Sequence, residues 1–352
     1  MTAPRRIVTG RPPAGGGDGN SLAGNCSWRH KRKPKELAPK LAIADPMVDA
    51  TLAKPRQHLL VDVPTLIVAF GTYSVWALLT WYHALLPWWL LMPFGAYVVC
   101  LHGGLQHEAV HGFPFRKRWL DAALVFPSLW LWLPYTHYRR THLLHHRDRR
   151  LTCPIDDPES YYVTDVQWDR MGPFHRAYRQ AMNTLAGRLL LGPIYAVWRL
   201  LIELLDSIVS WDTHRLREWA LHVPAVAIVL VWVVGICGMP LWQYVALFAY
   251  PGLALTLMRS FAEHRARGEI GERTILVEAG PVMSLLYLNN NLHAMHHADP
   301  TAPWHERWAT YRARRDELLA KNGNYVFKGY GELLRRYLFT AKEPVRHPVA
   351  EL

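Results

Sequence analysis

The chain has 352 residues, of which 51% are hydrophobic and 19% are charged, and its formal net charge is +12. Ordinary soluble domains carry about 25% charged residues, so this composition argues against a wholly soluble protein. A strongly basic chain can bind nucleic acid, but the placement of the basic residues favours a membrane surface as their partner.

Two long stretches, residues 64–107 and 219–258, contain no Asp, Glu, Lys or Arg. One helix needs about 20 apolar residues to cross a bilayer, so each stretch is long enough for two crossings joined by a tight turn. The turns are expected near Pro87 and Pro240. The sequence therefore predicts four transmembrane helices in two hairpins, at about residues 64–83, 88–105, 219–235 and 241–258.

The 40 Lys and Arg residues divide into 11 before the first stretch, 15 between the two and 14 after the second. If each stretch crosses and returns, all of them lie on one side, which the positive-inside rule identifies as the cytoplasm. We therefore expect a multi-pass protein of a bacterial-type inner membrane with cytoplasmic termini. Attraction to anionic lipid headgroups explains the positive charge without nucleic acid.

The remaining segments are interpreted from composition and periodicity. Residues 1–57 are expected to be a disordered basic cytosolic tail, residues 58–310 the membrane domain, and residues 311–352 a cytosolic C-terminal segment. Leu120–Pro134 is too short to span a bilayer and is interpreted as interfacial or re-entrant. Arg188–Trp211 is amphipathic, which predicts a helix lying in the membrane interface.

The 19 histidines form clusters with helical spacing. Imidazoles three and four residues apart project from one face of a helix. Three clusters and one further histidine follow the cytosolic ends of the predicted spans. Their nine members are His107, His111, His142, His145, His146, His264, His293, His296 and His297. Neutral imidazole binds zinc, iron, copper and nickel, and a structural zinc takes only four ligands. Nine imidazoles therefore suit two metal ions, held in a helical cytosolic cap on an all-α membrane protein.

Two other histidines lie close to these clusters. His102 precedes His107 by five residues and is interpreted either as a ligand or as a packed core residue. His137 precedes His142 by the same spacing, and a role as a ligand is less expected for it.

Three segments resemble the histidine boxes of the membrane fatty acid desaturase/hydroxylase superfamily. They are Gln106-His107-Glu108-Ala109-Val110-His111-Gly112, Thr141-His142-Leu143-Leu144-His145-His146 and Leu292-His293-Ala294-Met295-His296-His297. The resemblance covers about residues 60–310. It implies a non-haem di-iron site with two iron ions that activates O2, and a lipid-like or aliphatic substrate. It also implies an external electron donor, such as ferredoxin or rubredoxin with its reductase.

The details of the boxes refine this resemblance. The three residues within the first box are closer to the alkane hydroxylase, carotenoid ketolase and bacterial small-substrate desaturase branches than to acyl-CoA desaturases. His264 matches the extra histidine after the fourth span. Ser260 stands where acyl-CoA desaturases carry an asparagine, and Asn289 or Asn290 is a candidate to replace it.

Ligand imidazoles usually donate their second N–H to a carboxylate or carbonyl. Several acidic residues near the boxes are candidates for this contact, together with one asparagine. They are Glu108, Asp148, Asp157, Glu263 and Asn290, with Asp156 and Glu159 as further acidic candidates.

Three alternatives to desaturation of an acyl lipid or similar aliphatic substrate remain. A hydroxylase or ketolase of the same superfamily would use the same centre. The segment from His107 to His111 also reads as the HExxH motif of a zinc protease, which leaves the two other clusters unexplained. A metal transporter would carry its ligands within the spans, whereas these histidines lie at or beyond the span ends.

Overall fold

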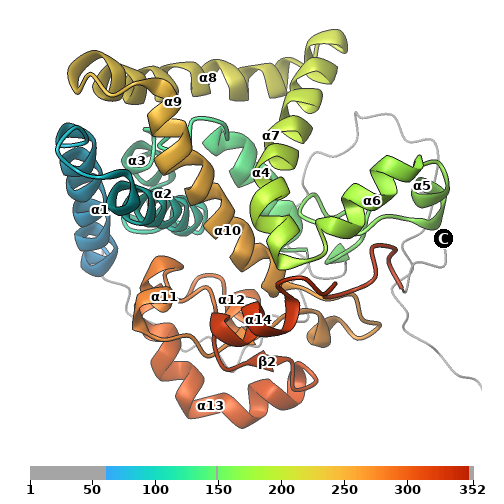
Figure 1. Cartoon of the computed structure of the whole chain (residues 1–352). Coiled ribbons are helices and arrows are strands. Elements are labelled where there is room, and N and C mark those ends of the chain that lie inside the picture. Colours follow the sequence, from blue (N-terminus) through green and yellow to red (C-terminus); the bar gives the residue numbers. More distant parts are fainter. Residues whose placement is uncertain (1–60, 148–149, 349–352) are drawn as a thin grey trace, which may run out of the picture.

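A computed structural model of the chain describes residues 61–147 and 150–348, and these fold into a mostly helical protein (Figure 1). The predicted tail of residues 1–57 and the candidate Asp148 lie outside the described residues.

The longest helices lie where the two uncharged stretches and the amphipathic segment occur in the sequence. They are α1 (Val63–Trp81), α2 (Trp88–Val110), α7 (Leu185–Val209) and α8 (Thr213–Leu230), which a π-helix continues over Val231–Ile236. A fifth long helix is made of α9 (Leu241–Tyr244) and α10 (Tyr250–Glu263), which a π-helical turn over Val245–Ala249 joins. The shorter elements before α10 are α3 (Arg118–Leu124), α4 (Tyr135–His145), α5 (Asp165–Asp169) and α6 (Pro173–Ala181). After α10 come β1 (Leu276–Val277), α11 (Pro281–Leu286), α12 (His293–Ala298), α13 (Arg307–Lys321), β2 (Val326–Phe327) and α14 (Tyr330–Tyr337), with 3-10 turns at Ile270–Arg273 and Trp304–Glu306.

Five helices among the described residues are long and apolar enough to cross a membrane, whereas the sequence predicted four. They are Val63–Trp81, Trp88–Val110, Leu185–Val209, Thr213–Ile236 and Leu241–Glu263. Four of these coincide with the predicted spans. The two that carry histidine clusters at their ends, α2 and α9–α10, extend about one turn beyond the predicted limits.

The fifth candidate, α7, is the segment that the sequence predicted to lie in the membrane interface. Arg199 donates to the carbonyl of Pro158 at 3.0 Å, and the carboxylate of Glu203 lies 3.8 Å from His137. Part of the polar face therefore contacts the protein, whereas the side chain of Asp206 on the same face is 70% exposed. Leu201 and Leu205 are exposed as well, which explains why α7 has an apolar surface suited to lipid.

The apolar segment 120–134 is not among these candidate spans. Helix α3 ends at Leu124, three residues before Pro127, and the following residues turn back into the protein. Val125, Leu129 and Trp130 are buried there.

Helices α2 and α10 form the centre of the membrane part. Gly252 of α10 lies so close to α2 that an added Cβ would be 2.7 Å from Val99, and a Cβ on Gly95 would be 2.8 Å from Phe248. Small residues at such contacts let the backbones of membrane helices approach closely. This packing fixes the end of α2 relative to the end of α10.

The elements after α10 gather at the lower end of the view in Figure 1, below α2 and α10. Strand β1 pairs in parallel with β2, with Leu276 opposite Val326. Tyr330 and Leu333 of α14 are buried in the same core as Leu105 of α2. Helix α14, in the predicted C-terminal segment, is thus packed onto α2.

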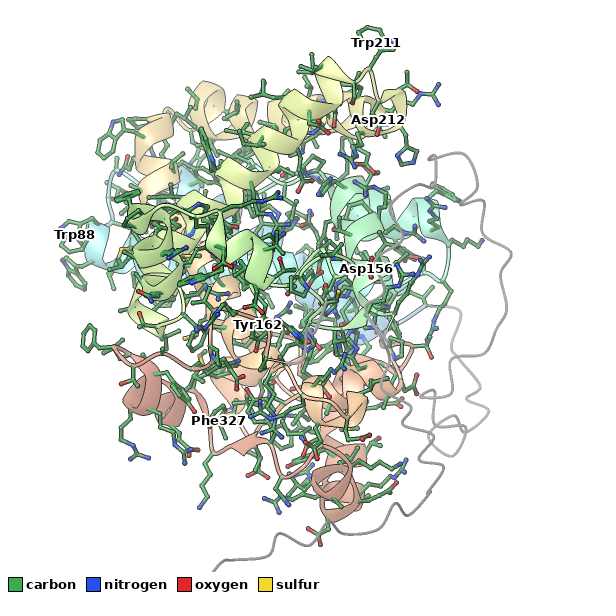
Figure 2. The ribbon with its side chains drawn as sticks, turned by 90° about the vertical axis from the view of Figure 1, so that its right-hand side faces the viewer. Trp88, Asp156, Tyr162, Trp211, Asp212 and Phe327 are labelled. Carbon is green, nitrogen blue, oxygen red and sulfur yellow. The ribbon has the colours of Figure 1, made fainter. Side chains whose placement is uncertain are left out.

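Large apolar side chains cover the outer surfaces of α1, α7 and α8. Phe70 is 77% exposed and Val209 is 86% exposed, far more than expected for a protein surface in water. Trp88 and Trp211 lie at the edge of the molecule (Figure 2), as tryptophan side chains do at a membrane interface.

Candidate metal centre

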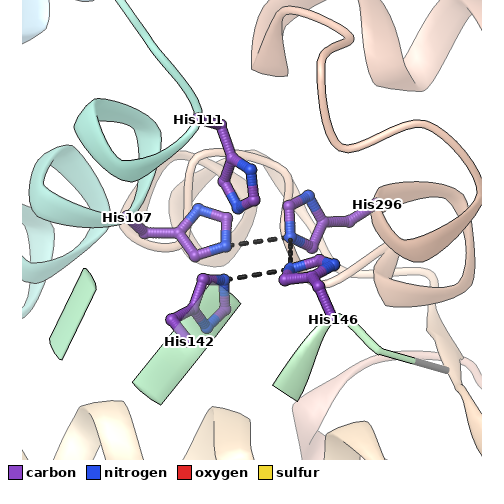
Figure 3. A group of neighbouring side chains, drawn as sticks. All are labelled: His107, His111, His142, His146 and His296. Carbon is purple, nitrogen blue, oxygen red and sulfur yellow. Dashed lines mark hydrogen bonds between the residues drawn. The ribbon is translucent and has the colours of Figure 1, made fainter. Parts of the chain in front are cut away.

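The nine clustered histidines come together as two neighbouring groups. A five-histidine group contains His107, His111, His142, His146 and His296, and a four-histidine group contains His145, His264, His293 and His297. Within each group the candidate ligand nitrogens all lie within 4.8 Å of one another. Figure 3 shows the imidazoles of the five-histidine group turned toward a common centre.

The division into groups follows from helix geometry. Successive residues of a helix are rotated by about 100°, so the side chain at i+4 lies about 40° from residue i, and the side chain at i+3 about 60° away on the opposite side. His142 and His146 accordingly belong to one group, and His145 to the other. The third cluster divides in the same way, with His296 separated from its two neighbours. Each HxxHH cluster therefore contributes to both groups.

Three helices point their C-terminal ends at the two groups. His111, His146 and His264 are the residues that end α2, α4 and α10. Gly112, with a φ of +89°, follows His111 and lets the chain leave α2. The C-terminal end of a helix carries a partial negative charge, so three such ends favour a cation between them.

The imidazole nitrogens face one another at short range in both groups. The Nε2 atoms of His107 and His296 lie 3.0 Å apart, and those of His145 and His264 also lie 3.0 Å apart. A metal–nitrogen bond of about 2.1 Å would place two adjacent ligands about 3 Å from each other. The spacing of the nitrogens thus fits a metal ion in each group.

The outer nitrogens of several of these rings are held by carboxylates. Nδ1 of His142 lies 2.9 Å from Glu159, and Nδ1 of His145 lies 2.9 Å from Asp157. Nδ1 of His107 lies 3.1 Å from Glu108 in the same manner. An ionised carboxylate only accepts hydrogen bonds, so each of these Nδ1 atoms carries a proton, and in the neutral form of the ring the lone pair is on Nε2.

Free lone pairs that converge in a buried site repel one another unless a cation lies between them. Nε2 of His111 is buried with no hydrogen-bond partner among the described residues. Buried polar atoms nearly always have a partner, so this nitrogen also indicates a site for a metal. The residues present fit two metal ions in both number and donor type.

Burial also favours the neutral, metal-binding form of most of these rings. It lowers the pKa of His146, His264, His293 and His296 well below the ordinary imidazole value, and neighbouring imidazoles add to the effect. His145 is the exception. Burial opposes its charged form, but Asp157 and Glu159 outweigh burial and raise the pKa of His145 to about 10.

The sequence profile described as "Fatty acid desaturase" matches residues 79–329. The chain belongs to the fatty acid desaturase family. The matched range includes all nine histidines of the two groups. A comparison with curated protein sequences gave no match.

Four of the five residues expected to support the ligands lie beside the clustered histidines, and the fifth, Asp148, lies outside the described residues. Glu108 and Asp157 lie beside His107 and His145, as described above. The carboxylate of Glu263 lies 3.2 Å from Nδ1 of His293. Asn290 lies between the groups, with its amide 3.3 Å from His293 and also 3.3 Å from His107.

Asn289 instead donates to the carbonyl of Trp304. Position 260 has a serine in place of the asparagine of acyl-CoA desaturases, and two asparagines were candidates to replace it. Asn290 is therefore the one of the two that reaches the histidines.

His102 and His137 do not join either group. The ring of His102 is buried against Tyr73, with centroids 5.7 Å apart. His137 lies 3.4 Å from the carboxylate of Glu218 on α8. Both rings are therefore packed against other elements instead of the nine histidines.

Sequence reasoning missed two arginines at this centre. Arg307 donates to Glu108 at 3.1 Å, and Arg259 lies 2.9 Å from Glu263. Both arginines are buried. A buried carboxylate signals that a cation must be near, but spacing alone does not say which one, because Arg307 comes from a helix 199 positions away.

A cavity of about 590 Å³ lies between α2, α4, α7 and α10 and is lined by neighbours of the clustered histidines, but by none of the nine histidines themselves. Trp130, Trp132, Leu253 and Leu257 form part of its apolar wall. The carboxyl groups of Glu159 and Glu263, which contact ligand histidines, also line it. Arg140, Arg199 and Glu203 also line the cavity, so a compartment with both apolar and charged walls lies beside residues that contact the two histidine groups.

Proposed function

We propose that this protein is a membrane-bound non-haem di-iron oxidase that uses O2 and external electrons to desaturate an acyl lipid or a similar aliphatic substrate. The observation that carries the proposal is the pair of histidine groups whose ring nitrogens converge, while carboxylates hold the outer nitrogens of several of these rings. Membership of the desaturase family supports the reaction class.

The nine histidines are proposed to hold two iron ions, five imidazoles at one and four at the other. Iron bound there would supply the oxidising power needed to activate O2 and cleave an aliphatic C–H bond. The chain's own contribution is to fix the ligands. Glu108, Asp157 and Glu159 hold the rings in the tautomer that presents Nε2, and Asn290 ties the two groups together.

The cavity of about 590 Å³ is proposed as the substrate site. Its apolar wall would bury an aliphatic chain and exclude water from the reacting carbons. Tyr138 and Glu159 also line the cavity, and the ring of Tyr138 lies 5.3 Å from that of His142. A chain entering the cavity would thus pass directly beside the histidine groups.

A hydroxylase or ketolase would use the same centre and the same cavity, and it stands as the second candidate. The zinc protease alternative has little support in the geometry. The carboxylate of Glu108, which would be its base, is fully buried between Arg307 and His107. A general base must reach a water beside the substrate.

The arrangement of the centre also bears on membrane topology. His111 directly follows α2 and His264 directly follows α10, and the two belong to neighbouring histidine groups, so α2 and α10 end on the same side of the membrane. An even number of crossings must lie between these ends. We propose that α8 and α9–α10 cross, and that α7 does not, because Arg199 and Glu203 lie near its middle and charged residues at a bilayer centre are costly. This proposal keeps four spans, with both termini and the histidines in the cytoplasm.

Electrons are proposed to come from a separate ferredoxin or rubredoxin with its reductase. Turnover of the purified chain with NAD(P)H alone would contradict this part of the proposal.

Lipid and metabolite mass spectrometry of cells that express the wild type or His142→Ala tests the reaction. Loss of two hydrogens from a cellular compound, seen only with the wild type, is the expected result. Gain of one oxygen would identify a hydroxylase, and gain of oxygen with loss of two hydrogens a ketolase. No difference between the two strains would contradict the proposal.

A further inference from the structure

The last turn of α10 leads directly into the four-histidine group and needs partners for its carbonyls. The last four carbonyls of a helix accept no hydrogen bond from an N–H of the same helix. Here all four from Phe261 to His264 accept hydrogen bonds from residues that follow the helix in the chain, and that of Ala262 also accepts from the Tyr325 hydroxyl at 3.2 Å. Lys342 Nζ lies 2.5 Å from the carbonyl of Phe261, 3.4 Å from that of Ala262 and 2.7 Å from that of His264. The backbone N–H of Ile275 donates to Glu263.

Lys342 is held in this position by its own neighbours. The segment 342–347 follows α14 and runs along three other parts of the chain. The backbone N–H of Lys342 donates to the carbonyl of Asn183, and that of His347 to Val163, both at 3.0 Å. The side chain of His347 lies 3.1 Å from the hydroxyl of Thr152.

These contacts connect the segment to the carboxylates of the metal centre. The N–H of Thr152 donates to Asp157 at 2.8 Å, and Asp157 in turn holds His145. The segment 342–347 is therefore connected to the four-histidine group in two ways. Lys342 contacts the end of α10, and His347 contacts Thr152 in the loop that carries Asp157.

A cation at the C-terminal end of a helix is stabilised by the helix dipole and by the free carbonyls. Lys342 supplies this cation at the end of α10. There the chain leaves the helix at His264, which has an extended conformation with φ −128° and ψ 149°. The other side of His264 is held by a bridge to Thr274. The two contacts together fix the direction in which the imidazole of His264 points.

We infer that Lys342 is a positioning residue, which caps α10, orients His264 and thereby sets the metal affinity of the four-histidine group. Lys342 lies beyond residue 329, where the match to the desaturase family ends. The inference rests on the proposed function in one respect, since it requires a metal ion in each group. The five-histidine group has no contact with Lys342 among the described residues and serves as an internal reference.

The test is a titration of the metal-free full-length protein with Co²⁺ under anaerobic conditions, for the wild type, Lys342→Met, Lys342→Arg and Lys328→Met. Lys328 is an exposed lysine of the same C-terminal region and provides the matched control. Contacts that orient a metal ligand typically change metal affinity by about 10- to 100-fold. We expect Lys342→Met to bind one ion as the wild type does and the other about 10- to 100-fold more weakly. Lys342→Arg should restore the second ion, because it keeps the charge.

A general structural role for Lys342 predicts a different result, namely equal weakening of both ions. That outcome, or two ions bound by Lys342→Met with unchanged affinity, would overturn the inference. If Lys342→Met does not fold, Lys342→Gln, which can still donate to a carbonyl, should show a smaller weakening confined to one ion. Combining Lys342→Met with His146→Ala, which damages the five-histidine group, should weaken both ions.

Hydrogen exchange of the metal-free protein separates this inference from the proposed function. The N–H of Arg265 donates to Arg273 directly after His264. The hydrogen-exchange rate of this amide should be higher in Lys342→Met than in the wild type. An unchanged rate would overturn the inference. If the wild type binds fewer than two ions while the exchange rates of the wild type and Lys342→Met still differ, only the di-metal function is contradicted.

Discussion

Arg307, the first residue of α13, donates to the carboxylate of Glu108 in α2 at a distance of 3.1 Å, and their side chains are only 1% and 0% exposed. Glu108 in turn lies 3.1 Å from Nδ1 of His107. The pair therefore connects the C-terminal part of the chain to a ligand of the five-histidine group.

Replacing Arg307 by methionine should destabilise the protein strongly. The substitution leaves the carboxylate of Glu108 buried without a cation, and breaking a buried ion pair in this way costs about 3–5 kcal/mol. The free energy of unfolding can be measured by SDS titration in mixed micelles. The double variant with Glu108→Gln should recover part of the loss, because the uncompensated charge is gone. Equal stability of Arg307→Met and the wild type would contradict this account.

Asp157→Asn should weaken metal binding in the four-histidine group alone. An asparagine can still accept from His145 but carries no charge, so the ring loses the partner that makes it a strong ligand. The expected loss of affinity is about 10- to 100-fold. Asp156→Asn is the matched control, because Asp156 is adjacent in sequence but lies 3.3 Å from Arg150 instead. Equal effects of the two substitutions would argue against a specific role for Asp157.

These carboxylates illustrate what could be predicted from the sequence. The spacing of the boxes predicted that the nine histidines meet, because helical periodicity fixes the direction of neighbouring side chains. Closeness to the boxes also identified Asp157 and Glu263 as candidates. The contacts of Arg307 and Lys342 depend on tertiary packing of segments that carry no periodic signal, so no local pattern indicated them.

The helix α7 shows a second limit of sequence reasoning. Its amphipathic pattern predicted a helix in the membrane interface, but it did not indicate that Arg199 contacts Pro158 or that Glu203 lies beside His137. The periodic pattern of polar and apolar residues gives the direction of the polar face relative to the apolar one. It does not tell whether water or other polar residues of the protein cover that face.

The proposed topology can be tested by labelling single-cysteine variants with membrane-impermeant reagents. Ser210→Cys, between α7 and α8, should react only from the cytoplasmic side if α7 does not cross. Cys237, at the turn between α8 and α9, should react only from the opposite side. Labelling of Ser210→Cys from the outside would contradict the proposal and identify α7 as a crossing helix.

Filling the four-histidine group at pH 8 should release about one proton, because a ligand must be deprotonated to bind. The pKa of His145 is raised to about 10, so this ring is charged at pH 8 in the metal-free protein. The pKa values of His264 and His293 are lowered, so these rings have no proton to lose there. Calorimetry in buffers of different ionisation enthalpy measures the release. Asp157→Asn should reduce it, and absence of release from the wild type would contradict the assignment.

The same raised pKa has a consequence for the metal-free protein. A group whose pKa is higher in the folded state stabilises that state below its unfolded pKa, here near 6.5, and this contribution is lost as the pH rises toward about 10. The metal-free protein should therefore lose stability between these pH values, as measured by thermal unfolding. The metal-loaded protein should not show this dependence, since the metal replaces the proton.

Iron analysis of the purified full-length protein tests the central claim most directly, with His296→Ala and His293→Ala as site-specific variants. The two histidines lie three residues apart on α12 but belong to different groups. The account predicts two iron ions per chain for the wild type and one for each variant, with the remaining ion in the other group. A wild type that holds a single zinc ion, or no metal after anaerobic loading with Fe²⁺, would contradict it.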